Sequence, residues 1–196
     1  EKQFQDQEDV KKDIELLSSQ VERCNEILKR LTLNPVEEDE FIDKDLTMRD
    51  YLSEIILSFK EISKKKFIFN FDQFSNVKKI TKSIEIVYGL RNFIGNANKF
   101  SKNSIYINLK SDSEFTEITI EDDGNGYPKD VLSKIGEPYL RSNDPIDKSK
   151  TGLGLGLFIG KTLLEKNFAS INCRNSKTRT GAEVIIKWNN KDLFNI

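Results

Sequence analysis

The sequence predicts an α/β sandwich, a mixed sheet with helices on one face, preceded by a long helix with a heptad repeat. Three observations support this prediction. From residue 47 onward, β-type runs alternate with runs of helical spacing. Glycine and leucine alternate at 152–157, directly before an apolar helical run at 158–166. Near the N-terminus, residues 5–31 repeat apolar side chains at heptad spacing.

The composition is that of one compact domain with an appendage. The 196 residues carry 31 lysines and arginines against 32 aspartates and glutamates, and 37% are hydrophobic. This near-neutral balance offers no electrostatic footprint for nucleic acid, so no nucleic-acid partner is expected. No apolar stretch is long enough to span a bilayer. The absence of histidine excludes histidine-based metal sites and catalytic triads within the chain.

The first residue bears on the length of the natural protein, and the cysteine content bears on its cellular location. The chain starts at Glu1 without a signal-like segment, so we expect a piece of a longer protein. Cys24 and Cys173 have neither the density of a disulfide framework nor Cys-x-x-Cys metal spacing. We therefore expect a cytoplasmic location, in a reducing compartment.

A strict heptad seam runs along the predicted helix at 5–31. Its apolar positions alternate four and three residues apart: Val10, Ile14, Leu17, Val21, Cys24, Leu28 and Leu31. A narrow seam with polar residues elsewhere needs a partner helix, so we expect a homodimer through this helix. The alternative is a helix packed on its own domain, although such helices usually show a wider apolar stripe.

The remaining elements follow in order. Pro35 and the acidic run at 37–40 indicate a linker at 34–46. Thr47 and Asp50 form a capping pair that opens a helix to about residue 62. Helical spacing also marks 79–100, and β-type patterns mark 66–71, 104–110, 114–121, 169–174 and 182–188. We therefore expect a folded domain at 47–196.

The glycine-rich run consists of Gly152, Leu153, Gly154, Leu155 and Gly156. Glycine permits positive φ and a close approach to the backbone, and a helix N-terminus presents unpaired N–H groups to an anion. The run therefore predicts a phosphate cradle. It fits neither the Gly-x-Gly-x-x-Gly dinucleotide fingerprint nor the P-loop, whose first glycine position holds Leu155. A plain glycine-rich turn is the alternative.

Asn92 and Asn96 lie four residues apart in the predicted helix at 79–100 and so share one of its faces. Carboxamide oxygens are hard ligands suited to Mg²⁺, which also binds substrate phosphates and water. Lys99, three residues further on, could reach a phosphate oxygen. Ordinary solvated polar residues are the alternative for each position taken alone.

An acidic, glycine-containing segment, Glu-Asp-Asp-Gly-Asn-Gly at 121–126, lies at the end of the predicted strand at 114–121. It is typical of a simple turn, and its spacing does not fit an EF-hand calcium loop. In the alternative interpretation Asp122 reads a ligand, because an ionised carboxylate only accepts hydrogen bonds and pairs with an exocyclic amine such as that of adenine. Gly124 and Gly126 would then let the chain pass close to the base.

Four motifs occur in a characteristic order. They are Asn-x-x-x-Asn-Ala-x-Lys-Phe at 92–100, Asp-x-Gly-x-Gly at 122–126, Gly-x-Gly-x-Gly-Leu at 152–157 and Thr-Gly-Ala-Glu-Val at 180–184. Together they resemble the catalytic, ATP-binding domain of sensor histidine kinases, a GHKL or Bergerat fold, over residues 47–188. The helix at 1–33 resembles the second helix of the dimerisation and histidine-phosphotransfer hairpin. Residues 20–28 and 135–139 resemble the redox-responsive RegB/PrrB kinases.

The resemblance implies a role for each matched position. Asn96 would be the Mg²⁺ ligand, Asn92 would support the metal or its waters, and Lys99 would contact phosphate. Asp122 would read adenine, and residues 127–151 would form a mobile lid over ATP. The other implied ATP-binding residues are Gly124, Gly126, Arg141, Gly152, Leu153, Gly154, Leu155, Gly156 and Thr180.

The activity implied by the resemblance is transfer of the γ-phosphoryl group of ATP to a histidine, for relay to a response-regulator aspartate. Gyrase, Hsp90 and MutL use a glutamate to activate water where this chain has Asn92, and an amide cannot act as that base. The family's acceptor histidine lies on the hairpin's first helix, before residue 1, so this chain is not expected to phosphorylate itself. Membrane segments of such kinases would lie outside the chain.

Departures from the family leave alternatives open. The phenylalanine of the F box is missing, with Gly136 in that region and Tyr139 as a substitute. A degenerate kinase that binds nucleotide and dimerises without catalysis is therefore the alternative to an active enzyme. Serine-directed kinases share the fold but lack a preceding heptad hairpin. Cys24 is either a small buried hydrophobe or, as the resemblance implies, a redox-active thiol near the dimer axis.

Overall fold

The computed structural model describes residues 46–72, 79–80, 83–138 and 154–194. All of them belong to one compact unit, Lys44–Ile196. The predicted helix at 5–31, with Cys24, and most of the predicted linker lie outside the described residues, as do Arg141, Gly152 and Leu153. Within the described ranges, no helix combines the length and apolarity needed to cross a bilayer.

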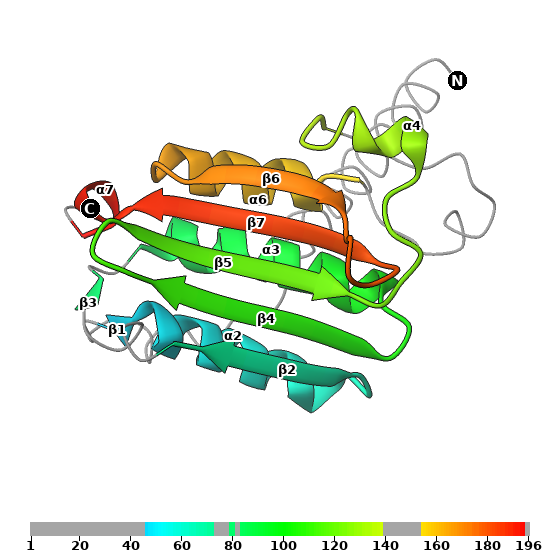
Figure 1. The fold of residues 1–196 in the computed structure, drawn as a ribbon, viewed down its shortest axis with the longest axis horizontal. Helices are drawn as coiled ribbons and strands as arrows, with labels where there is room; N and C mark the ends of the chain where they lie inside the picture. Colours follow the sequence, from blue (N-terminus) through cyan, green and yellow to red (C-terminus); the bar gives the residue numbers. More distant parts are fainter. Residues whose placement is uncertain (1–45, 73–78, 81–82, 139–153, 195–196) are drawn as a thin grey trace, which may run out of the picture. The chain divides into compact units, whose positions relative to one another are not determined.

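A five-stranded mixed sheet forms one layer of the domain (Figure 1). Its strands, in spatial order, are β2 (Lys66–Phe71), β4 (Ser104–Ser111), β5 (Phe115–Asp122), β7 (Ala182–Asn189) and β6 (Ser170–Asn175). Strands β2 and β4 are parallel, and every other neighbouring pair is antiparallel. The mixed sheet predicted from the sequence is confirmed.

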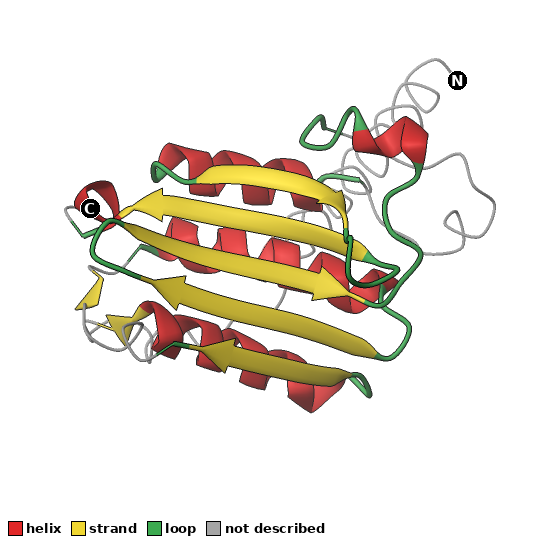
Figure 2. Cartoon of the chain, in the orientation of Figure 1, coloured by secondary structure: helices red, strands yellow, loops and turns green. Residues whose placement is uncertain are grey.

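Three helices form the second layer, all on one face of the sheet (Figures 1 and 2). They are α2 (Met48–Ile62), α3 (Ile84–Phe100) and α6 (Gly156–Lys166). The core between the layers includes Leu52, Leu90, Ile107, Ile186 and Trp188, which are all completely or almost completely buried. The predicted α/β sandwich with helices on one face is therefore confirmed.

Local sequence signals explain where α2 begins. The Thr47 hydroxyl accepts a hydrogen bond from the backbone N–H of Asp50, and the Asp50 carboxylate accepts one from the backbone N–H of Thr47. This reciprocal capping box satisfies two N–H groups that a helix end leaves unpaired. The predicted start of this helix is confirmed.

The prediction of one helix over 79–100 is wrong at its N-terminal end. Lys79–Ile80 form strand β3, which pairs antiparallel with β1 (Leu46–Thr47). Helix α3 starts only after Ser83, whose hydroxyl accepts a hydrogen bond from the backbone N–H of Ile86. Ile80 lies in β3 and is fully buried. Its apolar side chain is thus explained by packing of a strand residue in the core, and not by a helical repeat.

Two short helices were not expected from the sequence. Helix α4 (Lys129–Leu132) follows the acidic turn after β5, and α7 (Asn190–Leu193) follows β7. Each spans four residues, about one turn, which is too short to show a periodic apolar pattern. Helix α4 lies at the start of the segment predicted as a lid.

Two glycines let α3 and α6 pack in close contact. A Cβ on Gly89 would lie 2.5 Å from Leu164 Cγ, and a Cβ on Gly160 would lie 3.0 Å from Asn92 Cβ. Because Gly89 meets the later part of α6 and Asn92 its earlier part, the two helices run antiparallel. This crossing places Asn92 beside the start of α6.

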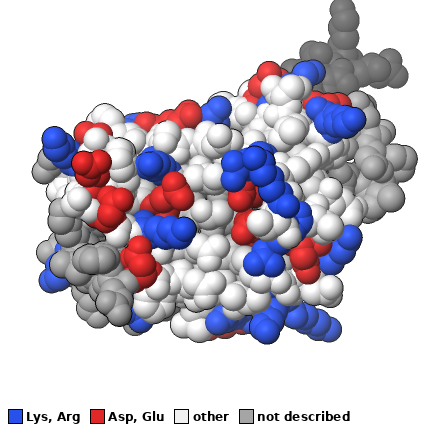
Figure 3. Space-filling model, viewed as in Figure 1, with Lys and Arg blue, Asp and Glu red and all other residues white. Residues whose placement is uncertain are grey.

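The other face of the sheet carries polar and charged side chains. The strands lie in front of the helices in Figure 1, so the space-filling view of Figure 3, in the same orientation, shows this face with its interspersed acids and bases. One row of paired residues across it consists of Tyr106, Glu121, Glu183 and Arg174. We call this surface the open face.

Candidate functional site

The Asn92 side chain is oriented by its own helix. Its Nδ2 donates a hydrogen bond to the backbone oxygen of Tyr88 at 2.9 Å, one turn earlier. Its Oδ1 lies 3.4 Å from the position that a Cβ on Gly156 would take. The amide nitrogen is therefore engaged, and the amide oxygen is directed toward the first residue of α6.

Asn96 lies one turn beyond Asn92 on the same face of α3 and is half-buried. Its side chain makes no hydrogen bond to any residue in the described ranges. Because α3 and α6 are antiparallel, Asn96 lies past the N-terminal end of α6. Two amide oxygens along one helix face suit a hard cation that also binds phosphate oxygens and water.

Carboxylate clusters do not compete for that role. Across the described part of the chain, no group of three Asp, Glu or Cys side chains is arranged to hold a metal ion. The donor set at α3 thus fits Mg²⁺ in the manner typical of nucleotide sites, where the substrate supplies most of the negative charge.

The start of α6 leaves backbone N–H groups available. Gly154 has φ +71°, a conformation that favours glycine, and Leu155 follows as the N-cap residue. Among the residues that the structure describes, no side chain caps this helix end, and its first turn carries no acid. An 11-residue helix with uncapped N–H groups attracts an anion such as phosphate.

Asp122 is a buried carboxylate at the C-terminal end of β5. It is 3% exposed, and its Oδ1 accepts hydrogen bonds from the backbone N–H groups of Gly124, at 2.7 Å, and Ala182, at 3.3 Å. Among the described residues, none donates a hydrogen bond to Oδ2. Burial raises the pKa of Asp122, although the two backbone hydrogen bonds oppose this effect. Oδ2 is thus the atom available to a ligand donor.

Glycines enclose Asp122 on two sides. A Cβ on Gly181 would lie 1.9 Å from the backbone oxygen of Asp122 and 2.3 Å from its Oδ1. A Cβ on Gly124 would lie 2.4 Å from the backbone oxygen of Phe100, the last residue of α3. Only glycine fits at either position without movement of the backbone.

Helix α3 therefore connects the two halves of the candidate site. Its middle, at Asn92, contacts the start of α6, and its end, at Phe100, contacts the turn after Asp122. Eight residues of helix span about 12 Å. An elongated ligand with a hydrogen-bond donor at one end and an anionic group at the other fits this arrangement.

The other predicted residues lie at the margins of this site. Lys99 is half-buried near the end of α3, with its Nζ 5.2 Å from the centre of the Phe100 ring. Thr180 is exposed in the turn between β6 and β7, directly before Gly181. Gly126, with φ +75°, follows the Asp122 turn.

The segment after Asp122 is held by a residue that the sequence did not indicate. Asn175, the last residue of β6, accepts a hydrogen bond from the Tyr127 backbone N–H at 2.6 Å and donates one to the Tyr127 backbone oxygen at 3.1 Å. A Cβ on Gly126 would lie 2.6 Å from Asn175 Oδ1. No local pattern reveals this contact, because Asn175 and Tyr127 are 48 residues apart.

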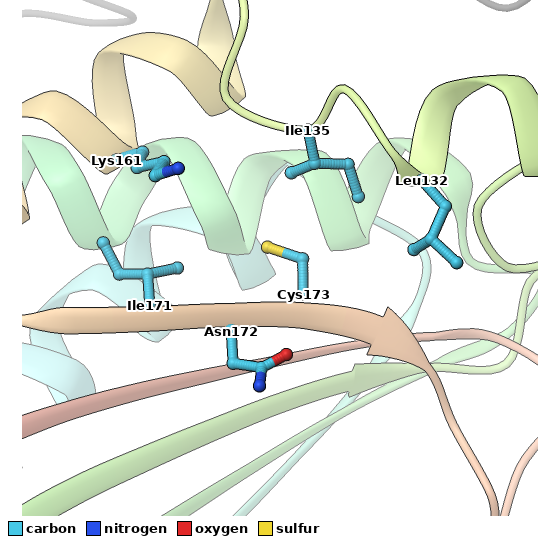
Figure 4. A pocket seen from close by; sticks show the side chains of 6 residues that line it. All are labelled: Leu132, Ile135, Lys161, Ile171, Asn172 and Cys173. Atoms are coloured by element: carbon cyan, nitrogen blue, oxygen red, sulfur yellow. The ribbon is translucent and has the colours of Figure 1, made fainter.

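A small cavity of about 160 Å³ lies between the α4 segment, α6 and β6 (Figure 4). Its lining residues are Leu132, Ile135, Lys161, Ile171, Asn172 and Cys173. Burial raises the pKa of the Cys173 thiol to about 11, with Lys161 and a hydrogen bond to Tyr127 acting in the opposite direction. Since the thiolate is the reactive form, this shift makes Cys173 less reactive near neutral pH than an ordinary thiol.

Asp123 has a structural role beside Asp122. Its carboxylate accepts hydrogen bonds from the backbone N–H groups of Lys102, Asn103 and Ser104, at 2.7 to 3.1 Å. Burial acts to raise the pKa of Asp123, but these hydrogen bonds outweigh it and the pKa is lowered. Asp123 thereby fixes the chain between α3 and β4.

Comparisons with known proteins place the chain in a family. Residues 81–192 match the family model described as histidine kinase-, DNA gyrase B- and HSP90-like ATPase. The chain is 30% identical over 210 residues to the sensor histidine kinase RegB of Cereibacter sphaeroides, covering 95% of this chain and 44% of RegB. The chain thus spans less than half the length of this curated relative.

Solved structures show the same fold at low sequence identity. The mycobacterial sensor histidine kinase MprB has a TM-score of 0.62 and 19% identity, covering 74% of this chain and 96% of that one. Full-length ShkA in complex with AMPPNP has a TM-score of 0.61 and 18% identity, covering 81% of this chain and 33% of that one. The family match and the similarity to RegB, together with this shared fold, confirm the resemblance to sensor histidine kinases seen in the sequence motifs.

Proposed function

The chain belongs to the family of histidine kinase-, DNA gyrase B- and HSP90-like ATPases, and from this premise we propose that it is the catalytic core of a sensor histidine kinase. It would bind ATP and transfer its γ-phosphoryl group to a histidine on a dimerisation helix. The observation that carries the proposal is the path of α3. Its residue Asn92 lies beside the start of α6, and its last residue lies beside the turn after Asp122.

ATP would lie along α3 with its base at Asp122. The free Oδ2 of Asp122 would accept a hydrogen bond from the exocyclic amine of adenine. The phosphates would reach the uncapped start of α6 and the glycines before it. ShkA, a structure of the same fold, was solved in complex with AMPPNP, which supports nucleotide binding by this fold.

Catalysis in this site would rest on positioning. Mg²⁺, when bound, would neutralise charge on the phosphates, and the amide oxygens of Asn96 and Asn92 would hold it or its waters. Asn92 offers no general base, because an amide does not take up a proton near neutral pH. The γ-phosphoryl group would therefore be kept from water until an acceptor histidine arrives, and Lys99 and Arg141 would contact phosphate oxygens.

The longer protein would supply the acceptor and the partners. We propose that the helix at 5–31 forms a homodimer, that residues 127–151 close over ATP as a lid, and that the phosphohistidine passes its phosphoryl group to a response regulator. A cytoplasmic kinase core agrees with these roles. Membrane or sensor segments would belong to regions beyond this chain.

Calorimetric titration of ATP with Mg²⁺ tests the site. The Asn96→Ala variant should lose about tenfold or more in affinity for ATP with Mg²⁺, and much less without the metal. Asn70→Ala is the matched control, since Asn70 is an exposed amide of β2 whose side chain, within the described ranges, bonds only to Asn108 on the open face. Equal affinities of wild type and Asn96→Ala in Mg²⁺ would refute the metal assignment.

A further inference from the structure

Glu121, the neighbour of Asp122 in the chain, has a buried carboxylate on the open face of the sheet. Glu121 precedes Asp122 in β5, and successive residues of a strand point to opposite faces of the sheet. Glu121 is nevertheless only 7% exposed. The turn at 176–181, between β6 and β7, contributes to this burial through its contacts with the carboxylate.

Three side chains of the turn bind this carboxylate. The hydroxyls of Ser176 and Thr178 donate hydrogen bonds to Glu121 Oε1, at 2.8 and 3.2 Å. Arg179 Nε lies 3.7 Å from Glu121 Oε2, and its guanidinium lies 3.4 Å from the centre of the Tyr106 ring. The Glu121 carboxylate is buried, whereas Thr178 and Arg179 are exposed. Hydrogen bonds to an ionised acceptor are stronger than those between neutral groups, so the carboxylate anchors this side of the turn.

Ser176 connects this network to the backbone of the turn. Its hydroxyl oxygen accepts hydrogen bonds from the backbone N–H groups of Thr178 and Arg179, at 3.2 and 3.0 Å. Its own backbone N–H donates to the backbone oxygen of Gly181 at 2.9 Å. The position of the turn is thus tied to Glu121 through both side chains and backbone.

The far end of the same turn contacts Asp122. Gly181 packs against the Asp122 backbone so closely that a Cβ would overlap it, and the Ala182 N–H donates to Asp122 Oδ1. Displacement of this end of the turn would change one of the two hydrogen bonds that orient this carboxylate.

We propose that Glu121 is a positioning residue of the nucleotide site. From the open face it holds the turn at 176–181, and the turn holds Gly181 and Ala182 against Asp122, so that Oδ2 faces the adenine amine. Glu121 itself does not contact the nucleotide. This inference rests on the proposed function, because it concerns the same ATP site.

Glu183 provides a matched control. It pairs with Glu121 across β5 and β7, shares the open face and is 8% exposed. Its carboxylate binds Arg174 of β6 and accepts no hydrogen bond from the described residues of the turn. Removal of Glu183 therefore deletes a similar buried charge without releasing the turn.

The test is the affinity for ATP and for GTP, measured by calorimetry with Mg²⁺, together with the melting temperature of each variant. Glu121→Ala should bind ATP about tenfold more weakly, and its preference for ATP over GTP should narrow. Glu121→Gln should recover most of the affinity, because an amide oxygen still accepts from Ser176 and Thr178. Glu183→Ala should stay within about twofold of wild type for ATP.

Three results would overturn the inference alone: unchanged ATP affinity in Glu121→Ala, an equal loss in Glu183→Ala, or a loss that affects ATP and GTP equally. If Glu121→Ala does not fold, Ser176→Ala and Arg179→Ala replace it. Each should lose less affinity for ATP than expected for Glu121→Ala and should show the same narrowing of the preference for ATP over GTP. Absence of ATP binding by the wild type would instead overturn the proposed function, and this inference with it.

Discussion

The backbone N–H of Ala182 donates a hydrogen bond to Asp122 Oδ1, joining residues 60 positions apart in the chain. Together with the N–H of Gly124, it occupies one carboxylate oxygen and leaves the other for a ligand. The orientation of Asp122 is thus set by two backbone groups, which persist when the side chain is changed. Predictions about Asp122 can therefore separate recognition from folding.

Replacement of Asp122 by Asn should weaken ATP binding without harming the fold. The Asn oxygen can still accept from Gly124 and Ala182, but the other position then carries an N–H₂ donor facing the adenine amine. We expect a loss of about 10- to 100-fold in ATP affinity. Calorimetric titration measures it, and retention of wild-type affinity would show that Asp122 does not read the base.

The same variant should be at least as stable as the wild type near pH 7. Burial raises the pKa of Asp122, so the folded protein binds this proton more tightly than the unfolded chain does. The stabilising effect of the proton is complete below the unfolded pKa and is lost as the pH rises through the folded pKa. Melting curves should show the Asp122→Asn advantage at pH 7 shrinking toward acidic pH.

Asp123 should show the opposite pH dependence. Its lowered pKa means that the ionised form contributes stability above the unfolded pKa, and that this contribution is lost as the pH falls through the folded pKa. Asp123→Ala should therefore melt at a lower temperature than wild type at pH 7, with a smaller difference at acidic pH. Asp130→Ala, an exposed acid of α4, is the control and should change little at either pH.

Replacement of Gly181 by Ala should damage both stability and ATP binding. Its Cβ would lie 1.9 Å from a backbone oxygen, which cannot move aside as a side chain can. We expect a loss of about 2 kcal/mol in the free energy of unfolding, from denaturant titration. Gly156→Ala should unfold like the wild type, because among the described residues its Cβ would meet only Asn92 Oδ1, at 3.4 Å. Equal stability of the two variants would contradict this account of the packing.

Thiol labelling should distinguish the two cysteines. Since the pKa of Cys173 is raised to about 11, its alkylation in the folded protein should be slow near pH 7.5 and should accelerate only at strongly alkaline pH. If mild oxidation yields interchain dimers on non-reducing gels, they should persist in Cys173→Ser and disappear in Cys24→Ser. Dimers that require Cys173 would contradict the low reactivity that its raised pKa implies.

Features set by short-range signals could be predicted from the sequence. The capping box of Thr47 and Asp50 involves residues three apart, and the strands show their alternation locally. The boundary at Ser83 was missed because the buried Ile80 belongs to a strand yet fits the helical spacing. Local periodicity does not distinguish these two causes of burial.

The candidate site was predictable only in part, for a similar reason. Motifs indicated Asn92, Asn96, Asp122 and the glycines before α6, but not how they are supported. The hydrogen bond between Glu121 and Ser176 joins residues 55 positions apart in the sequence, and the one between Asn175 and Tyr127 joins residues 48 positions apart. Such contacts depend on which strands are neighbours in the sheet, and that order appears only in the fold.

The central claim is tested most directly by transfer of γ-labelled phosphate from ATP. The longer protein, with its preceding hairpin helix restored, should acquire label on a histidine in the presence of Mg²⁺, and Asp122→Asn should acquire it far more slowly at limiting ATP. Normal ATP binding with no label on histidine would contradict the claim and would identify the chain as a non-catalytic, nucleotide-binding scaffold.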